Sequence, residues 1–421
     1  QEMKRVVKDK DIGPLIATDM TRCIHCTRCV RFGEELAGIM ELGATGRGEH
    51  MRIGTYVAQS VDSELSGNMI DLCPVGALTS KPFRYSARTW ELNDVPGVSP
   101  HDCVGANLNV QVRRNKVMRV LPRENEDVNE IWLADRDRFS YEAVNSTERL
   151  LKPMVRANGT WRETDWSTAL NVAVDGMQKV IAAHGPQSIG ALASPTSTVE
   201  EFYLLQKLVR ALGSGNVDHR LRQRDFSDDA DAPLFPYLGL PIRELEMVDA
   251  ALLIGSNIRK DQPLLGLRLR KAFLRDAALF AVNPVDYDFN FDFKAKAIID
   301  PAAMPAALAR IARVLAESTG AGLPSEVATL AAGKPSDAER AIAAGLKDAN
   351  SPSILVGNFA MAHPQAALLR SLADLIAELS GARLGILPEA NGAGGWLAGC
   401  VPQRGANGSP AQPAGRNAAD M

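Results

Sequence analysis

The sequence predicts a chain of three parts: an α+β domain organised around four cysteines, a small mostly-β unit, and a larger α/β domain with parallel sheets. Three observations lead to this prediction. Four of the six cysteines fall within the first 73 residues, two alternating apolar runs follow, and from about residue 165 long amphipathic stretches alternate with short apolar runs. Strands that alternate with helices are typical of a parallel sheet covered on both faces.

The bulk composition narrows the class of protein. A chain of 421 residues can form two or three domains with real cores. Its net charge of −3 gives no reason to expect nucleic acid or an anionic membrane surface as a partner. We expect no membrane-spanning segment, because no apolar run is long enough. The charged start argues against a signal peptide, and its first residue, Gln1, leads us to expect a processed chain or a fragment.

The cysteine pattern is the strongest functional signal. Cys23, Cys26 and Cys29 lie two residues apart, and Cys73 is followed at once by Pro74. Bacterial ferredoxins use the same spacing of cysteines, with a proline after the last one, to hold a cubane iron–sulfur cluster. Structural zinc and incidental thiols are the alternatives, but zinc sites usually pair two separate knuckles. So few cysteines, most of them in one motif, also indicate a reducing compartment rather than a disulfide framework.

The neighbours of the motif have weaker interpretations. His25 could replace a ligand, although we expect it to lie beside the ligands because the cysteines already supply four. Three arginines flank the motif and either tune the reduction potential or form a solvated basic face: Arg22, Arg28 and Arg31.

The remaining candidate residues are expected to have no functional role. Cys103 and Cys400 are predicted to be inert thiols. The glycine groups at 43–48 and 392–395 do not sit between a strand and a helix, so we do not expect them to bind phosphate. No set of residues suggests a catalytic acid–base pair or nucleophile.

The expected elements of the first two parts follow in order. We predict a short helix over 30–38, a glycine-rich loop over 43–54, a strand over 56–61, and a turn with a helix start over 74–79. Two alternating runs, 108–112 and 116–120, predict a hairpin.

The third part has the pattern of an α/β domain. Thr198 and Glu201 form a capping box that opens a helix over 199–212. Short apolar strands are expected at 189–192, 250–254, 279–282 and 354–356, with helices near 262–275, 301–317 and 364–380. Ligands of such sheets lie beyond the carboxyl ends of strands, which points to 255–257, 283–284 and 357–358. The tail from Asn391 is expected to be a loop without a core.

Three segments carry a resemblance to a known family: 20–32 (MTRCIHCTRCVRF), 54–56 (GTY) and 71–82 (DLCPVGALTSKP). They resemble the large iron–sulfur subunit of proton-pumping NADH:quinone oxidoreductase, respiratory complex I. The resemblance implies that Cys23, Cys26, Cys29 and Cys73 hold one 4Fe–4S cluster in the electron path from flavin to quinone. It also implies a 2Fe–2S and a further 4Fe–4S cluster in the full-length subunit, whose ligand motifs are absent before residue 23, so we expect an internal fragment.

The C-terminal half resembles the molybdopterin oxidoreductases. Their small domain carries four cysteine ligands, and the aligned positions here hold Pro100, Cys103, Asn107 and Ala134. The position of the molybdenum ligand falls near Arg224. The resemblance therefore implies three domains, namely a 4Fe–4S cluster domain (1–92), a degenerate molybdopterin-type iron–sulfur small domain (93–150) and a molybdopterin oxidoreductase-like domain (151–421), truncated at its C-terminus, with no molybdopterin.

The function implied is that of an electron relay within NADH:quinone oxidoreductase, with no catalytic residue of its own. The implied partners are the flavin- and NADH-binding subunit and the downstream iron–sulfur subunits. The implied place is the cytoplasmic face of the bacterial inner membrane, or the matrix side in mitochondria, without direct membrane insertion. Two redox alternatives remain: an active molybdopterin enzyme similar to formate dehydrogenase or nitrate reductase, and the diaphorase subunit of an NAD-reducing hydrogenase.

Overall fold

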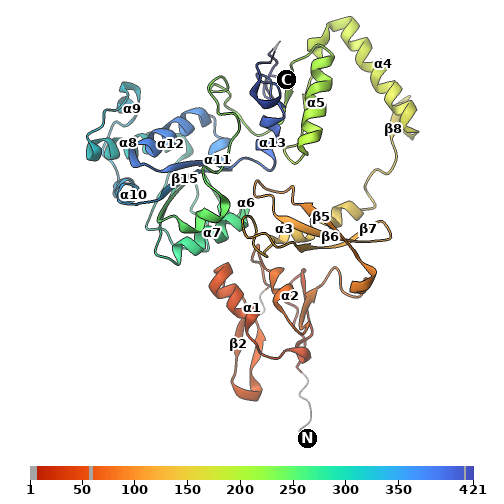
Figure 1. Ribbon diagram of the computed structural model, residues 1–421, viewed down its shortest axis with the longest axis vertical. Coiled ribbons are helices and arrows are strands. Elements are labelled where there is room, and N and C mark those ends of the chain that lie inside the picture. The colour runs from red at the N-terminus through yellow and green to blue at the C-terminus, as the bar shows by residue number, and fades with distance from the viewer. Residues whose placement is uncertain (1–6, 56–59, 412–413) are drawn as a thin grey trace. The chain divides into compact units, whose positions relative to one another are not determined.

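The computed structural model describes residues 7–55, 60–411 and 414–421 (Figure 1). The chain divides into two compact units. Unit 1 comprises Gln1–Tyr141, Leu238–Ala360 and Leu368–Leu387, and unit 2 comprises Glu142–Tyr237, Met361–Ala367 and Pro388–Met421. Both units are therefore assembled from segments that are far apart in the sequence.

The N-terminal part of unit 1 combines two small antiparallel strand pairs with two short helical segments. Strand β1 pairs with β4, and β2 pairs with β3. A short α-helix continues directly into a π-helical turn, and a second helix leads back to Cys73. The elements are β1 (Ile16–Thr18), α1 (Arg28–Arg31), η2 (Phe32–Ala37), β2 (Gly43–Thr45), β3 (Arg52–Gly54), α2 (Asn68–Leu72) and β4 (Leu78–Ser80).

The helix predicted over 30–38 is confirmed by α1 and η2. The loop predicted over 43–54 is wrong, because its two ends pair as the β2–β3 hairpin. The helix start expected after Cys73 is also wrong: residues 78–80 form β4, whose backbone completes the pair with β1. Most of the strand predicted over 56–61 lies outside the described residues.

A three-stranded antiparallel sheet follows in unit 1. The predicted hairpin is confirmed by β6 (Asn107–Arg113) and β7 (Lys116–Pro122), and β5 (Asn93–Val98) adds an outer strand that was not predicted. Helix α3 (Asp135–Phe139) packs against β7. The turn at Arg114 and Asn115 uses positive φ angles of 50° and 61°, which suit a tight hairpin.

The larger part of unit 1 is a five-stranded parallel sheet in the order β14-β13-β12-β15-β16. The strands predicted at 250–254, 279–282 and 354–356 are confirmed, and two outer strands were missed. Every residue of the central strands β12 and β15 is buried, as expected for strands covered on both faces. The strands are β12 (Ala250–Ile254), β13 (Ala278–Asn283), β14 (Ala295–Ile298), β15 (Pro352–Val356) and β16 (Arg383–Ile386).

Helices cover this sheet, with α7 on one side and α8 and α12 on the other (Figure 1). The three helices predicted in this region are confirmed as α7, α8 and α12, while α9 and α10 were missed. The helices are α6 (Ile258–Asp261), α7 (Pro263–Phe273), α8 (Met304–Thr319), α9 (Ser325–Leu330), α10 (Asp337–Lys347), α11 (Asn358–Met361) and α12 (Ala366–Ser380). Single 3-10 turns join the elements of the chain at Met20–Arg22, Gly48–His50, Thr89–Glu91, Ser140–Asn145, Pro186–Ser188, Ile242–Met247, Pro301–Ala303 and Ala406–Gly408.

Unit 2 has a smaller core. The capping box of Thr198 and Glu201 opens α5 (Val199–Ala211), as predicted. The strands β10 (Ala191–Leu192) and β11 (Val217–Asp218) pair in parallel. The other elements are β8 (Met154–Ala157), β9 (Thr160–Glu163), α4 (Trp166–His184) and α13 (Gly392–Leu397).

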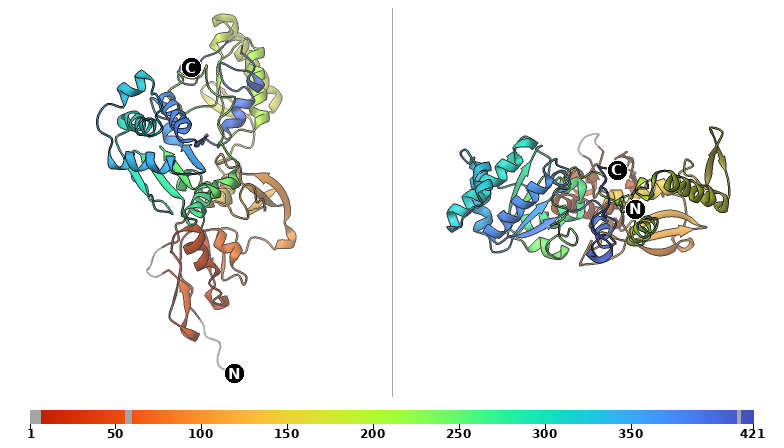
Figure 2. Two further views of the ribbon diagram at one scale, coloured as in Figure 1. Left: turned by 60° about the vertical axis from the view of Figure 1, so that its left-hand side comes forward. Right: turned by 90° about the horizontal axis from the view of Figure 1, so that it is seen from above.

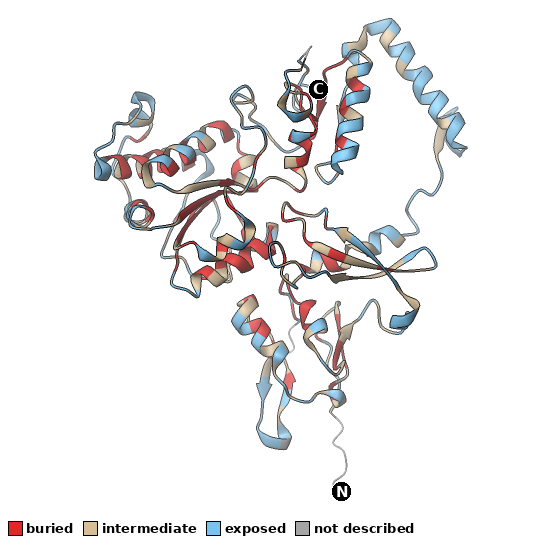
Figure 3. Cartoon of the chain, viewed as in Figure 1, coloured by how far each residue is buried: buried red, intermediate tan, exposed pale blue. Residues whose placement is uncertain are grey.

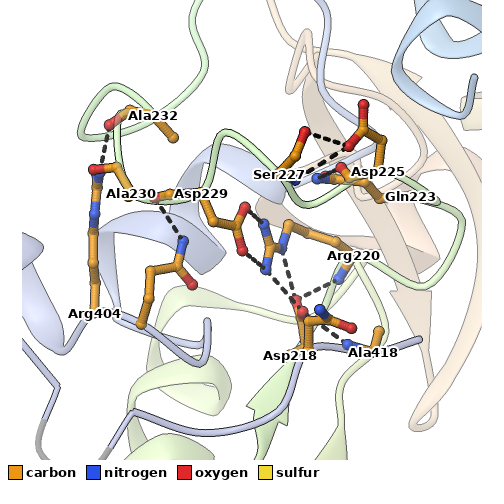
Figure 4. A network of polar contacts seen from close by, with 12 residues as sticks. Asp218, Arg220, Gln223, Asp225, Ser227, Asp229, Ala230, Ala232, Arg404 and Ala418 are labelled. Carbon is orange, nitrogen blue, oxygen red and sulfur yellow. Dashed lines mark hydrogen bonds and ion pairs between the residues drawn. The ribbon is translucent and has the colours of Figure 1, made fainter. Parts of the chain in front are cut away.

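The C-terminal tail is part of this core, so the prediction of a loop without core residues is wrong. Cys400 and Val401 are fully buried, and Ala398 and Cys400 pack with Phe202 and Val209 of α5. Tail and core are further joined by a polar network in which Asp218 accepts a hydrogen bond from the backbone N–H of Ala418 (Figure 4).

The two units differ in how much apolar surface they bury. Figure 3 shows buried residues concentrated along the parallel sheet and its helices, whereas α4 is coloured as exposed over most of its length. Helix α4 buries none of its side chains. Over the described ranges, no helix combines the length and the apolar character needed to cross a membrane.

Candidate functional site

The four cysteines of the motif line one pocket in unit 1. Cys23 and Cys26 lie in the loop between Met20–Arg22 and helix α1, Cys29 lies in the first turn of α1, and Cys73 is the C-cap of helix α2. The antiparallel pairing of β1 with β4 brings these two segments together, because β1 precedes the first cysteines and β4 follows Cys73. Their side chains share the pocket with an apolar lining that includes Met20, Ile53, Val75, Ala77 and Leu78.

Backbone N–H groups around the cysteines point toward their sulfurs. His25 and Thr27, which separate the cysteines, have φ angles of 55° and 59°. This left-handed conformation is uncommon for such residues, and it turns successive peptide groups so that the loop wraps around the pocket. The N–H of His25 donates to Sγ of Cys23, and the N–H of Leu78 donates to Sγ of Cys73, each at 3.4 Å.

The thiols are close enough to influence one another. The pKa of Cys29 is raised to about 11, mainly by burial and to a smaller degree by the charges of Cys23, Cys73 and Cys26. Thiolates are the form that binds iron, so metal binding at this pocket must displace protons. Cys26 is the one thiol of the four that is exposed, while the other three are partly buried.

The flanking arginines take different positions. Arg22 pairs with Asp19 at 2.8 Å, and Arg31 pairs with Glu35 at 2.8 Å on the surface. Arg28 lines the pocket itself. The structure thus places one of the three predicted arginines at the pocket and engages the other two in exposed ion pairs.

Other predicted residues lie away from this pocket or serve it differently. His25 contributes its backbone N–H to Cys23. Cys400 is buried in unit 2, where burial raises the pKa of its thiol to about 12. Burial also raises the pKa of Cys103 strongly. Across the described part of the chain, no group of three or more His, Cys, Asp or Glu is arranged to hold a single metal ion.

The donor set fits an iron–sulfur cluster. Sulfur from four cysteines, three from the segment 23–29 and one from the returning segment, matches the ligation of cubane clusters. The two N–H groups directed at sulfur are the kind of contact that tunes such clusters. Sequence reasoning identified the cysteines but missed the donor at Leu78, which lies on the unpredicted strand β4, and the apolar wall, part of which lies on the unpredicted strand β3.

A second group of polar side chains surrounds Cys103. Asp102 is buried, and its carboxylate accepts hydrogen bonds from the N–H of Val104 at 2.9 Å and from Nη2 of Arg136 at 3.2 Å. Burial, followed by the charge of Asp137, raises the pKa of Asp102 to about 6. Asp137 is buried too and accepts a hydrogen bond from Oγ of Ser99 at 2.6 Å.

The carboxyl ends of the central strands, where ligands were expected, pack against one another. The N–H of Ser256 donates to Oδ1 of Asn283 at 2.9 Å, and Nδ2 of Asn283 donates to the carbonyl of Ser256 at 3.0 Å. A side chain at Gly357 would collide with Ser256. Gly255, with a φ of 54°, lies against the backbone of Ala360. The turns at the carboxyl ends of these strands therefore bond to and pack against one another.

The fold and the cysteine pocket together define an iron–sulfur protein joined to an α/β domain of the molybdopterin-enzyme type. A family model described as molybdopterin oxidoreductase matches residues 149–386, more than half of the chain, so the chain belongs to the molybdopterin oxidoreductase family. Two further models match: "NADH-quinone oxidoreductase subunit 3, ferredoxin-like domain" over 13–79 and "NADH-ubiquinone oxidoreductase NDSU1/NuoG-like, 4Fe-4S domain" over 92–142.

The particular relatives are subunits of one enzyme. The chain is 45% identical over 268 residues to the G subunit of NADH-quinone oxidoreductase from Rickettsia felis, covering 64% of this chain and 39% of the relative. It is 40% identical over 304 residues to the NADH-ubiquinone oxidoreductase 75 kDa subunit of Reclinomonas americana, covering 68% and 42%. The predicted resemblance is thus confirmed, and the chain spans about two-fifths of the length of these relatives.

A solved structure supports the fold alone. Acetylene hydratase from Pelobacter acetylenicus superposes with a TM-score of 0.55 at 15% identity, covering 68% of this chain and 43% of that protein.

Proposed function

We propose that this chain is an electron-relay part of NADH:quinone oxidoreductase and that Cys23, Cys26, Cys29 and Cys73 hold one 4Fe–4S cluster. The observation that carries the proposal is the pocket in which these four side chains, from two distant segments, come together. The relatives are named as subunits of NADH:quinone oxidoreductase, which supports the choice of this enzyme. The four cysteines of the pocket supply the ligands for the cluster.

A bound cluster would supply a one-electron donor and acceptor. The chain's own contribution is to hold it and shield it. The N–H groups of His25 and Leu78 stabilise negative charge on the sulfurs they face. The buried side chains of Met20, Ile53 and Leu78 exclude water from one side of the pocket. No proton transfer or covalent step by a side chain is required.

The partners in this proposal are the flavin- and NADH-binding subunit on one side and downstream iron–sulfur subunits on the other. The full-length subunit would carry a 2Fe–2S and a further 4Fe–4S cluster. The proposed location is the cytoplasmic face of the bacterial inner membrane, or the matrix side in a mitochondrion, without direct insertion. The relatives are bacterial and mitochondrial subunits of the same enzyme, which supports this assignment.

We further propose that 1–92 is the cluster domain, 93–150 a degenerate small iron–sulfur domain, and 151–421 a molybdopterin oxidoreductase-like domain used as a scaffold without molybdopterin. The family matches at 13–79, 92–142 and 149–386 support these divisions. At the aligned ligand positions only Cys103 is a cysteine. An active molybdopterin enzyme is the second candidate, and the relatives do not favour it.

The test is anaerobic reconstitution followed by iron, sulfide, zinc and molybdenum analysis and electron paramagnetic resonance (EPR) of the dithionite-reduced protein. We expect about four iron and four sulfide per chain, as the cubane ligation requires, with an S = 1/2 signal and without molybdenum. Zinc without sulfide would instead indicate a structural metal site. Stoichiometric molybdenum, or roughly twice the iron, would contradict the assignment of a degenerate scaffold.

A further inference from the structure

Two aromatic side chains stand almost fully in solvent just after the cysteine-bearing part of unit 1. Tyr85 is 90% exposed and Trp90 is 80% exposed. Each lies beside an arginine: the guanidinium of Arg84 is 4.9 Å from the ring centre of Tyr85, and that of Arg88 is 6.0 Å from the ring of Trp90. We call these four residues the aromatic–arginine surface. Exposed apolar groups that form one contiguous patch are typical of interaction sites.

The backbone at Tyr85 is held in a conformation that its side chain disfavours. Its φ is 65°, in the left-handed region where a bulky residue is a true outlier. The N–H of Ser86 donates to the carbonyl of Phe83 at 3.0 Å, so a tight turn fixes this geometry. The result is a tyrosine projected outward at the tip of a turn. Strained positions of this kind are concentrated at functional sites such as ligand clamps and switch regions.

The charge of this surface has one sign. Residues 81–90 include three cations and no acidic residue. Lys81 pairs with Asp11 and Arg84 lies beside Asp19, whereas Arg88 makes no ion pair with another described residue. The neighbouring hairpin turn adds Arg114 and Lys116, both exposed. Arg113 is tied to this segment through Glu91, with Nη2 2.7 Å from Oε1. A partner that covers this area must therefore bring carboxylates, because uncompensated cations would be costly to desolvate.

The surface is linked to the cysteine pocket by one shared carboxylate. Asp19 pairs with Arg22, which directly precedes Cys23, at 2.8 Å, and it lies 3.9 Å from Nη2 of Arg84. Arg84 also donates to the carbonyl of Thr18 at the end of β1. A protein bound on the aromatic–arginine surface would therefore lie close to the four cysteines.

We propose that the aromatic–arginine surface is a docking site for a partner protein that presents Asp and Glu side chains around an apolar recess. The two rings would enter the recess, and Arg88 would pair with the carboxylates, while Arg84 stays beside Asp19. Tyrosine, tryptophan and arginine are the residues that dominate binding energy at protein interfaces. Arginine in particular pairs with carboxylates through two parallel hydrogen bonds. This proposal extends beyond the relay function and does not require the cluster.

The experiment places a photo-cross-linker in the full chain assembled with its partner subunits. Trp90 is replaced by p-benzoylphenylalanine, the complex is irradiated, and cross-linked peptides are identified by mass spectrometry. We expect one dominant cross-link to a carboxylate-rich segment of one partner protein. Adding Arg88→Glu should lower its yield by about tenfold, because it would place a like charge opposite the partner's carboxylates.

Matched controls separate docking from folding. Arg162→Glu changes an exposed arginine beside the exposed Trp161 of unit 2 and should leave the cross-link unchanged. Tyr85→Asn keeps a residue that tolerates a positive φ but removes the ring. It should leave thermal stability equal or higher while reducing retention of the partner.

Several results would overturn the proposal. These are a cross-link to lipid, to this chain itself, or to a segment without carboxylates, the absence of any cross-link, and a Tyr85→Asn variant that retains the partner fully. Repeating the cross-link in a Cys73→Ser background distinguishes the two proposals, because that variant abolishes the proposed cluster and not the docking surface. The docking cross-link should persist there.

Discussion

Arg220 makes a two-point contact with the fully buried carboxylate of Asp218. Nε lies 2.9 Å from Oδ1, and Nη2 lies 2.9 Å from Oδ2 (Figure 4). The same guanidinium reaches Asp229 on its other side and lies 5.0 Å from the ring centre of Trp396. One cation therefore compensates two carboxylates inside unit 2, and Asp218 in turn holds the backbone of the tail at Ala418.

Replacing this guanidinium should be far more damaging than replacing a nearby exposed one. Arg220→Met leaves two carboxylates without their cation, and breaking a buried pair in this way costs about 3–5 kcal/mol. Arg222→Met removes an ion pair with Glu389 whose arginine is 79% exposed, and we expect a loss below about 1 kcal/mol. Denaturant unfolding followed by tryptophan fluorescence compares the two variants. Equal stabilities would contradict a structural role for the buried network.

The ligand assignment makes a prediction about iron content. Cys73→Ser should remove most of the iron from the reconstituted protein, because Cys73 is the only thiol that the returning segment contributes to the pocket. Cys103→Ser is the matched control, since Cys103 lies outside the pocket lining, and its iron content should equal that of the parent. The parallel sheet of unit 1 should stay folded in both variants, which circular dichroism can check. Unchanged iron in Cys73→Ser would refute the assignment.

Asp102 should make the protein less stable as pH rises. Its folded-state pKa of about 6 lies above the ordinary value of 3.8, so between these values the folded protein binds more protons than the unfolded chain. Stability therefore falls as pH rises through this window, and the cost is complete above about pH 6. Asp102→Asn retains an acceptor for Val104 and should stabilise the protein at pH 7.5 by up to about 3 kcal/mol.

Denaturant midpoints at pH 4.5 and pH 7.5 test this prediction. The difference between parent and Asp102→Asn should be small at pH 4.5 and larger at pH 7.5. The opposite trend would show that the ion pair with Arg136, rather than burial, controls the carboxylate.

Two helical glycines should respond in opposite ways to alanine. A Cβ at Gly345 of α10 would fall on the buried ring of Phe280, so Gly345→Ala should destabilise unit 1 by about 1–3 kcal/mol. A Cβ at Gly176 of α4 meets nothing within 4 Å, and Gly176→Ala should stabilise its helix by up to about 1 kcal/mol. Thermal unfolding of both variants tests this prediction. A destabilising Gly176→Ala would contradict it and would show that α4 is closely packed.

The features predicted correctly are those with a local physical cause. The capping box of Thr198 satisfies backbone donors within its own helix, so two residues three positions apart suffice to identify it. The apolar strand at 250–254 has no polar residue that could face water. The cysteine spacing works in the same way, since three of the four thiols lie within the short segment 23–29.

The features that were missed depend on distant partners. Gly43 and Thr45 have no apolar alternation, and β2 exists only because β3 pairs with it. Residues 78–80 resemble a helix start until β1 supplies their hydrogen bonds. The tail around Cys400 has an ordinary loop composition, and its burial results from contact with α5 almost two hundred residues earlier.

The distance along the chain between α5 and the tail also affects how unit 2 is made. Figure 2 shows the blue C-terminal segments beside the yellow-green helices of this unit, which leave the ribosome much earlier. At about 5–20 residues per second, residues up to Tyr237 wait on the order of ten seconds before Pro388–Met421 follow. During that interval Phe202 and Val209 lack the side chains that cover them in the finished unit. We therefore expect the nascent unit to expose apolar surface that is prone to aggregation until the C-terminal tail has been synthesised.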